Sequence, residues 1–298
     1  GCRVENLFRQ ADVREPIHAW KSTGMNGAVW RASVNGRDVI LPVEKTHIGT
    51  VPHDGLLDDR TVQVHSAAGH ANKTLVMAGC DPAVGIIASE LARSAHVRLI
   101  PLIRSSRDAL DLLKNGLIHV AGVHLGASET RDTNSRYVLS ALGSNYRLLR
   151  VARWQAGLAL APSAGIRSVN EAVTAKIRWI GREKGSGARQ CLDSIFIQCG
   201  KRPREFKYLA FDHRGVAESI RLGWADAGVC IRMTAEEMGL QFISLRDEEY
   251  DLCYPTPMED DPRIVALRAA MQSTAIRGVI GELPGYNASE CGAIVDAA

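Results

Sequence analysis

The segment at 185–189 reads Gly-Ser-Gly-Ala-Arg and stands where a helix is expected to begin. Glycine and serine at a helix N-terminus leave several backbone N–H groups and one hydroxyl pointing at the same spot. This arrangement is typical of an anion cradle, to which Arg182, Lys184 and Arg189 can add charge-assisted hydrogen bonds. In the alternative interpretation the segment is an ordinary turn in which Ser186 caps the helix and the cations are solvated.

A second helix start is expected at Cys80-Asp81-Pro82, because Asp can cap orphan N–H groups and Pro is tolerated at the first helical position. Two opposed helix N-termini would suit an anion. The Asp81 carboxylate would repel an oxyanion unless it caps the helix or accepts a hydrogen bond from a ligand donor, such as an amine, a base or a pterin. A thiolate at Cys80 is the third option, although no histidine stands near it in the sequence.

The other candidate contacts stand at expected strand ends, at helix starts or on two long connecting segments. Ligands collect at the carboxyl ends of strands in open α/β sheets. Ser105 could instead cap a helix, and Asp226 could orient a loop. The candidate histidines, His124 and His213, could be structural. The expected ligand contacts are Asp81, Pro82, Ala83, Ser105, His124, Trp154, Lys184, Gly185, Ser186, Gly187, Ala188, Arg189, His213, Val216, Asp226 and Tyr250.

Motifs for catalysis or metal binding are missing from the sequence. It has no G-x-S-x-G elbow, no H-E-x-x-H, no P-loop and no zinc-type cysteine spacing. The seven cysteines are scattered without a C-x-x-C pair, which favours free thiols in a reducing compartment. We therefore predict a binding protein without catalytic residues, metal or cofactor.

Composition excludes several classes. With 46% apolar and 23% charged residues, the 298-residue chain is neither disordered nor fibrous, and its length suggests two or three lobes. No apolar run is long enough to span a bilayer, and the first ten residues lack a secretory signal, so we expect a cytoplasmic protein without membrane contact. A net charge of +3 with dispersed Lys and Arg does not indicate a nucleic-acid surface.

The pattern of secondary-structure signals in the sequence changes near residue 72. Residues 1–71 contain two strand-like runs around Asn35-Gly36, a strong hairpin signal, and a third run at 61–66. From Lys73 strands alternate with amphipathic helices, beginning with a strand and a helix and continuing with a strand at 97–102. We predict a small β unit followed by an α/β domain.

The α/β part is expected to form two similar lobes. Residues 109–122 and 216–229 share a helix, a glycine stop and a strand. Two long strand-like segments, 146–162 and 240–254, would cross between the lobes, and a final helix with Ile264, Leu267, Met271 and Ala275 on one face would return to the first. The predicted domains are 1–71, a first lobe of 72–150 with 253–298, and a second lobe of 151–252.

Several segments together resemble a known family. These are AGCDPAVGIIASEL, GREKGSGARQCLD, His213 with Val216 and the following G-x-A-D-A-G-V, and LRDEEYDL. In this order they are similar to the periplasmic-binding-protein-like, molybdate-binding-like domain that occurs fused to helix-turn-helix regulators, over about residues 72–290. The resemblance implies a type II two-lobed fold with five-stranded mixed sheets and a ligand between the lobes. The R-x-x-G-S-G-x-R segment also resembles phosphate- and tungstate-binding proteins, with Ala188 in place of a threonine.

The first ten residues resemble the last turn of a repressor-type helix-turn-helix domain, so the chain is expected to begin just after a DNA reader. The leading hypothesis is a cytoplasmic sensor of an oxyanion such as molybdate or tungstate in a transcription regulator, contacting DNA only through that reader, with a homodimer expected of two-fold DNA readers. The alternatives are an extracytoplasmic solute-binding protein of a transporter and an enzyme on the same scaffold.

Overall fold

The computed structural model describes residues 15–21, 26–44, 52–58, 61–65, 68–125, 133–203 and 205–296. The chain divides into two compact units, Gly1–Thr74 and Leu75–Ala298. The helix-turn-helix-like segment at the N-terminus and Cys2 lie outside the described residues. Within the described part, no helix combines the length and the apolar character needed to cross a membrane.

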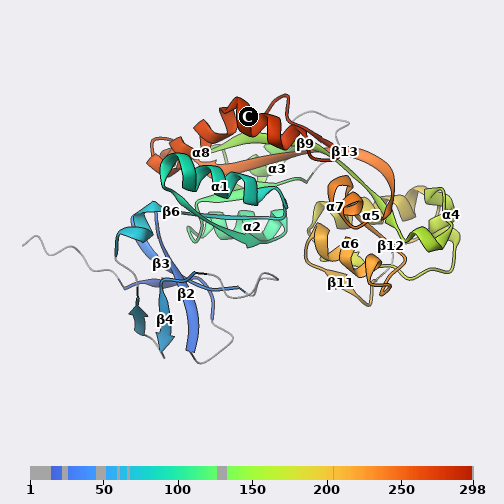
Figure 1. Ribbon diagram of the computed structural model, residues 1–298, viewed down its shortest axis with the longest axis horizontal. Coiled ribbons are helices and arrows are strands. Elements are labelled where there is room, and N and C mark those ends of the chain that lie inside the picture. The colour runs from blue at the N-terminus through green and yellow to red at the C-terminus, as the bar shows by residue number, and fades with distance from the viewer. Residues whose placement is uncertain are drawn as a thin grey trace, which may run out of the picture. The chain divides into compact units, whose positions relative to one another are not determined.

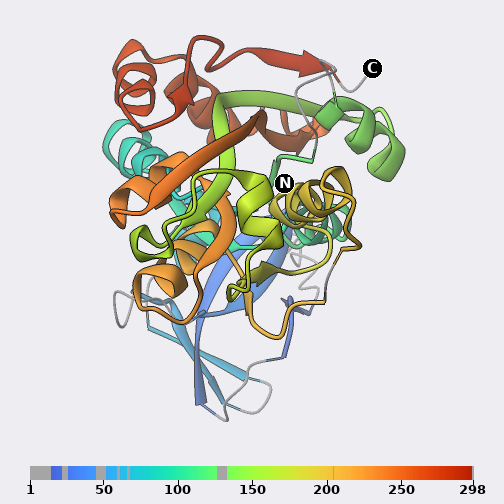
Figure 2. The same ribbon diagram turned by 90° about the vertical axis from the view of Figure 1, so that its right-hand side faces the viewer.

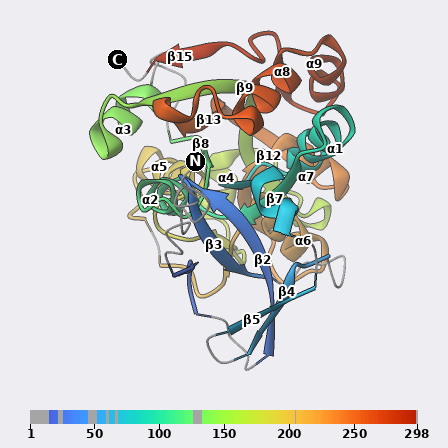
Figure 3. The ribbon, with the colours of Figure 1, turned by 90° about the vertical axis from the view of Figure 1, so that its left-hand side faces the viewer.

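The first unit is a small sheet (Figure 3). Its strands pair in the order β1-β3-β2-β4-β5. Asn35 and Gly36 both have positive φ, 50° and 71°, as the turn between β2 and β3 requires, so the predicted hairpin is confirmed. The bounds are β1 Ile17–His18, β2 Asn26–Val34, β3 Arg37–Pro42, β4 Gly55–Asp58, β5 Thr61–Val64 and a 3-10 turn, η2, at Ala68–Lys73.

The first lobe of the second unit begins with strands alternating with helices (Figure 1). Strands β6 and β8 pair in parallel, and the apolar faces of α1 and α8 help to form a continuous core that includes Ile87, Leu91, Ile264 and Leu267. The bounds are β6 Thr74–Gly79, α1 Val84–Ala95, β7 Arg98–Ile103, α2 Ser106–Lys114, β8 Val120–Val123, α3 Thr133–Leu142, η4 Thr256–Met258, α8 Pro262–Gln272, α9 Thr274–Gly281, β14 Tyr286–Asn287 and β15 Ile294–Asp296.

Two long strands, β9 (Tyr146–Leu160) and β13 (Gln241–Pro255), run from the first lobe into the second (Figure 1). They pair antiparallel over nearly their whole length, with register shifts at Ser244/Arg246 and Tyr250/Asp251. The two predicted crossings are thus confirmed. Because β9 and β13 also pair with strands of both lobes, most described strands of the second unit form one eight-stranded sheet, rather than the two five-stranded sheets that the resemblance implied.

The second lobe faces the viewer in Figure 2, in yellow-green to orange. Its α6 and β12 repeat the helix-to-strand step of α2 and β8, which confirms the internal echo in the sequence. Strand β12 joins β9, while β10 and β11 form a separate parallel pair. The bounds are η3 Pro162–Ala164, α4 Val169–Thr174, β10 Gly181–Arg182, α5 Gly187–Gln198, β11 Leu209–Ala210, α6 His213–Arg221, β12 Ala227–Ile231 and α7 Arg232–Glu237.

Two details of the predicted helices were wrong. Helix α8 ends at Gln272, and the extended Ser273 begins α9, so Ala275 lies on a different helix, where it is exposed. Helix α1 begins at Val84, because Asp81, Pro82 and Ala83 form a preceding turn. The Asp81 carboxylate accepts from the N–H of Ala83 at 2.9 Å and so stabilises that turn rather than the first helical residue.

Candidate functional site

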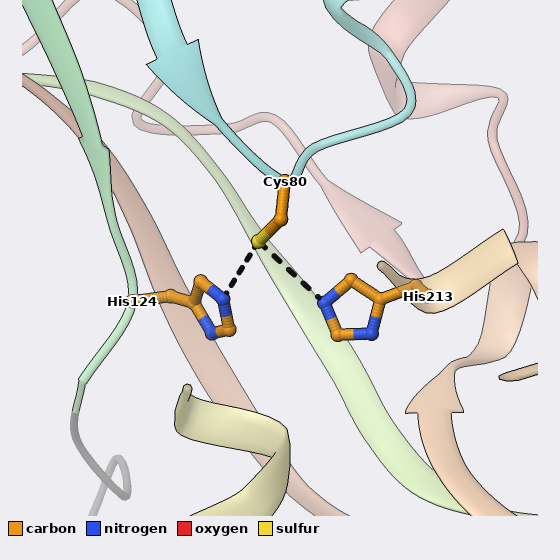
Figure 4. Close-up of side chains that lie close together, drawn as sticks. All are labelled: Cys80, His124 and His213. Atoms are coloured by element: carbon orange, nitrogen blue, oxygen red, sulfur yellow. Dashed lines mark hydrogen bonds between the residues drawn. The ribbon is translucent and has the colours of Figure 1, made fainter. Parts of the chain in front are cut away.

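Cys80, His124 and His213 meet at one point inside the second unit (Figure 4). Cys80 lies between β6 and α1, His124 directly follows β8, and His213 is the first residue of α6 in the second lobe. Both imidazoles direct Nε2 at the Cys80 sulfur, at 2.9 Å for His124 and 3.8 Å for His213. All three side chains are buried. The sequence therefore assembles a thiol and two imidazoles from three separate strand-to-helix connections.

Glu248, on crossing strand β13, fixes the orientation of His124. Its Oε2 lies 3.0 Å from His124 Nδ1 and also accepts from the indole Nε1 of Trp154 at 3.2 Å. Its Oε1 accepts from Arg246 Nε at 2.8 Å. The carboxylate is 1% exposed, so its charge is balanced by these neighbours and not by water.

The protonation states of the two histidines differ. Burial disfavours charge on His124, but its electrostatic interaction and hydrogen bond with Cys80, together with its contact with Glu248, outweigh burial and raise its pKa to about 10. Burial, together with the positive charges of Arg182 and His124, holds the pKa of His213 well below its ordinary value. Burial opposes ionisation of Glu248, yet His124 and Arg246 lower its pKa to about 2. At neutral pH His124 is cationic, His213 is neutral and Glu248 is ionised.

Aromatic rings enclose the cluster. The indole of Trp154 stacks on Tyr250 with ring centroids 4.7 Å apart, and it meets His124 edge-on at 5.1 Å. Tyr286 donates its hydroxyl to Asp81 Oδ1 at 2.7 Å, whereas Oδ2 of this buried carboxylate has no hydrogen-bond partner. Burial raises the pKa of Asp81 to about 6, against the hydrogen bonds from Ala83 and Tyr286. A ligand N–H or O–H would find an acceptor at this Oδ2.

Arg182 supplies a buried cation beside the cluster. It is 1% exposed, and its Nε and Nη2 donate to Glu183, both at 2.8 Å, while Nη2 also donates to the carbonyl of Phe211. Its Nη1 is buried without a partner. The same guanidinium is close enough to lower the pKa of His213, which stands two residues after Phe211. Two of its N–H donors therefore remain open next to the cluster.

The lobes touch at Gly187, the first residue of α5. A Cβ at this position would meet the carbonyl oxygen and ring Nδ1 of His124 in the other lobe. Arg246 on β13 also donates to the Gly187 carbonyl at 3.3 Å. The second glycine of the G-S-G segment thus permits a close approach between lobes.

Ser186 and Ser105 act as helix caps. Ser186 accepts from the N–H of Arg189 and donates to the carbonyl of Glu183, so its hydroxyl is fully engaged within the segment. Ser105 accepts from the N–H of Asp108 and donates to the Asp108 carboxylate. For both serines, the capping role that the sequence left open as an alternative is therefore present in the structure.

Several predicted contacts are not brought to the cluster. Lys184 is exposed and pairs with Glu205, and Arg189 pairs with its helix neighbour Asp193. Asp226 binds Arg178, as a loop-orienting residue would. Of the rest, Pro82 and Ala83 lie in the turn before α1, Gly185 approaches Arg107, and Ala188 and Val216 pack in the core of the second lobe. Those that converge on the cluster are Asp81, His124, Trp154, Gly187, His213 and Tyr250.

Glu248 and Arg246 were missed by sequence reasoning, and Cys80 was set aside for want of a nearby histidine. One signal could have found the first two. Positions 246, 248 and 250 alternate along a strand, so they share one face, and charged residues on the buried face of a crossing strand need partners.

Comparisons with known proteins agree with this architecture. A model of the PBP superfamily domain matches residues 88–272. The uncharacterized protein YvgK of Bacillus subtilis (strain 168) is 26% identical over 239 residues, covering 78% of this chain and 77% of that protein. The structure of the tungstate ABC transporter from Geobacter sulfurreducens is similar with a TM-score of 0.52 and 14% identity, over 70% of this chain and 98% of that one.

The structure of PhnD1 from Prochlorococcus marinus (MIT 9301) in complex with methylphosphonate is also similar, with a TM-score of 0.51 and 12% identity, over 76% of this chain and 93% of that one. At these identities the two structures share the fold with this chain. The family match spans the second lobe, both crossing strands and much of the first lobe. This chain belongs to the PBP superfamily and carries a small-ligand-binding domain of the periplasmic-binding-protein-like type.

Proposed function

We propose that this chain binds a small oxyanion where its two lobes meet, as the sensing domain of a cytoplasmic transcription regulator. The observation that carries the anion proposal is the buried Nη1 of Arg182, which has no hydrogen-bond partner. A buried donor without a partner costs about 1–3 kcal/mol, and a ligand oxygen would remove that cost. The N-termini of α5 and α6, at Gly187 and His213, both lie next to His124 and favour negative charge.

The ligand class follows from the mixture of donors and one acceptor. Arg182 offers N–H donors, while Asp81 Oδ2 offers a place for a ligand hydroxyl. A tetrahedral oxyanion that retains a proton satisfies both. Two proteins of the same fold are described with tungstate and methylphosphonate, which supports this class without fixing its member. Phosphate and methylphosphonate retain a proton near neutral pH and are therefore the first candidates by this criterion. Molybdate and tungstate, which the sequence resemblance suggests, are fully ionised there and would use the Arg182 donors alone.

The regulatory role is supported by two observations from the chain. The described cysteines are free, and most are buried, which suits a reducing cytoplasm. The first ten residues resemble the end of a helix-turn-helix domain. An anion that binds more tightly to the state in which the two lobes touch would increase the population of that state. A dimeric DNA-binding domain joined to this chain would then change its position on DNA.

Thermal unfolding of the full chain with molybdate, tungstate, sulfate, phosphate or methylphosphonate tests the proposal. A ligand at about 100 times its Kd stabilises the folded state by about 2.7 kcal/mol, and we expect a Tm increase of roughly 5–10 °C. Arg182→Gln should abolish the increase. Lys184→Ala is the matched control, because this exposed cation pairs with Glu205 away from the cluster.

An absence of any anion-dependent increase, or an equal increase in Arg182→Gln, would overturn the anion proposal. The regulatory part is tested separately by the coding sequence upstream of this segment. A helix-turn-helix domain there supports the regulator, whereas an apolar export signal supports the solute-binding alternative.

A further inference from the structure

We infer that Cys80, His124 and His213 form a binding site for one transition-metal ion of the zinc type. The Cys80 sulfur and one ring nitrogen of each histidine all lie within 4.8 Å of one another. A thiolate and two imidazoles are ligands that Zn²⁺ and related divalent ions prefer over Mg²⁺ or Ca²⁺. The metal ligands do not include Arg182 or Asp81, the two residues that the proposed anion site relies on for its donors and acceptor, although His213 lies at both sites.

The observed distances need little rearrangement for coordination. Zn–S bonds of about 2.3 Å and Zn–N bonds of about 2.0–2.1 Å place tetrahedral ligand atoms roughly 3.5 Å apart. The Cys80 sulfur lies 2.9 Å from His124 Nε2 and 3.8 Å from His213 Nε2. His124 would move away by less than about 1 Å. The proton held between Cys80 and His124 would leave to solvent as the ion binds.

Glu248 gives the site the outer support found around metal ligands. Histidine ligands commonly direct their second ring nitrogen to a carboxylate, which fixes the ring and raises its basicity. Glu248 Oε2 lies 3.0 Å from His124 Nδ1 in this way. Trp154 and Arg246 in turn hold the carboxylate, so the orientation of His124 does not depend on solvent.

The same three groups, Cys80, His124 and Glu248, also have the order of a nucleophile, a base and an orienting acid. His213 decides between the two interpretations. A nucleophilic triad needs one imidazole at the sulfur, whereas the structure directs a second Nε2 at the same sulfur from the opposite lobe.

The test uses the full chain, stripped of metal and titrated with Zn²⁺ against a chromophoric chelator. We expect one high-affinity Zn²⁺ per wild-type chain, and at least 100-fold weaker binding in Cys80→Ser and in His213→Gln. Cys253→Ala, which removes a buried thiol elsewhere, should bind as wild type does. Circular dichroism checks that each variant folds.

A measurement on the wild-type chain avoids dependence on the variants. Co²⁺ bound by a thiolate gives a sulfur-to-metal charge-transfer band, and we expect this band to appear with one equivalent of Co²⁺ and to vanish when Zn²⁺ is added. Failure to bind Zn²⁺, or binding that persists in both cluster variants, would overturn the metal site. Iodoacetamide could also alkylate Cys80 rapidly, at a rate that added Zn²⁺ leaves unchanged. This result would overturn the metal site in favour of a nucleophilic cysteine.

Discussion

Glu248 lies 3.0 Å from His124 although the two residues are 124 positions apart in the chain. The contact joins crossing strand β13 to the end of β8, and it places a carboxylate behind the imidazole that faces Cys80. Glu248 also accepts hydrogen bonds from Arg246 and Trp154. One buried carboxylate therefore positions three of the side chains around Cys80.

We predict that Glu248→Gln lowers the free energy of unfolding by about 3 kcal/mol, because it leaves the buried charges of Arg246 and His124 without their counterion. The amide is nearly isosteric with the carboxylate, so packing changes little. Urea unfolding at pH 7 measures the effect. Glu237→Gln is the control, since its carboxylate is 37% exposed and pairs with the exposed guanidinium of Arg214. Equal stability of wild type and Glu248→Gln would show that the carboxylate is not a counterion.

We predict that Gly187→Ala prevents the lobes from meeting as they do here. The new Cβ would overlap the carbonyl and ring of His124, so the contact between α5 and the first lobe must open. The apparent affinity for the anion should fall at least tenfold. It is measured by following Tm across a titration with the anion that stabilises the wild-type chain. Gly278→Ala is the control, because a Cβ at that helical position meets no atom within 4 Å and should raise stability by about 0.5–1 kcal/mol. Unchanged affinity in Gly187→Ala would contradict the role of this contact in binding.

The sequence was sufficient for the elements whose signals are local. The Asn35-Gly36 hairpin, the two crossing strands and the repeated helix-to-strand step all follow from turn chemistry or periodicity over a few residues. The prediction that Ala275 shares a helix face with Ile264, Leu267 and Met271 was wrong for a local reason. The helical period continues through Ser273, but the backbone of Ser273 is extended and starts a new helix.

The candidate site could not be assembled from spacing. Cys80 and His124 are 44 positions apart, and Cys80 and His213 are 133 apart, so no metal or catalytic motif links them. Their meeting depends on which strand ends share an edge and on how closely the lobes approach. Spacing also cannot show how Lys184 and Arg189 are paired. Their place next to a glycine-rich turn suggests an anion site, whereas the folded chain brings exposed Glu205 to Lys184 and helical Asp193 to Arg189.

Asp226 is predicted to act on stability and not on binding. Its carboxylate accepts from the backbone N–H of Arg178 at 2.8 Å and from the Arg178 side chain, which also donates to the carbonyl of Gly223. This clip holds the segment before β10 against the start of β12. Asp226→Asn should lower Tm by about 2 °C at pH 7, a small effect because solvent screens the exposed guanidinium.

The pH dependence distinguishes this role from a ligand contact. The hydrogen bonds from Arg178 lower the pKa of Asp226, so the carboxylate is favoured in the folded state. Its contribution is therefore complete above the unfolded-state pKa of about 4 and is lost as the pH falls through the lower folded-state pKa. We expect the Tm difference between wild type and Asp226→Asn to be constant from pH 6 to 7 and to shrink below about pH 4. Loss of anion or Zn²⁺ binding in Asp226→Asn at neutral pH would instead place this residue in the site.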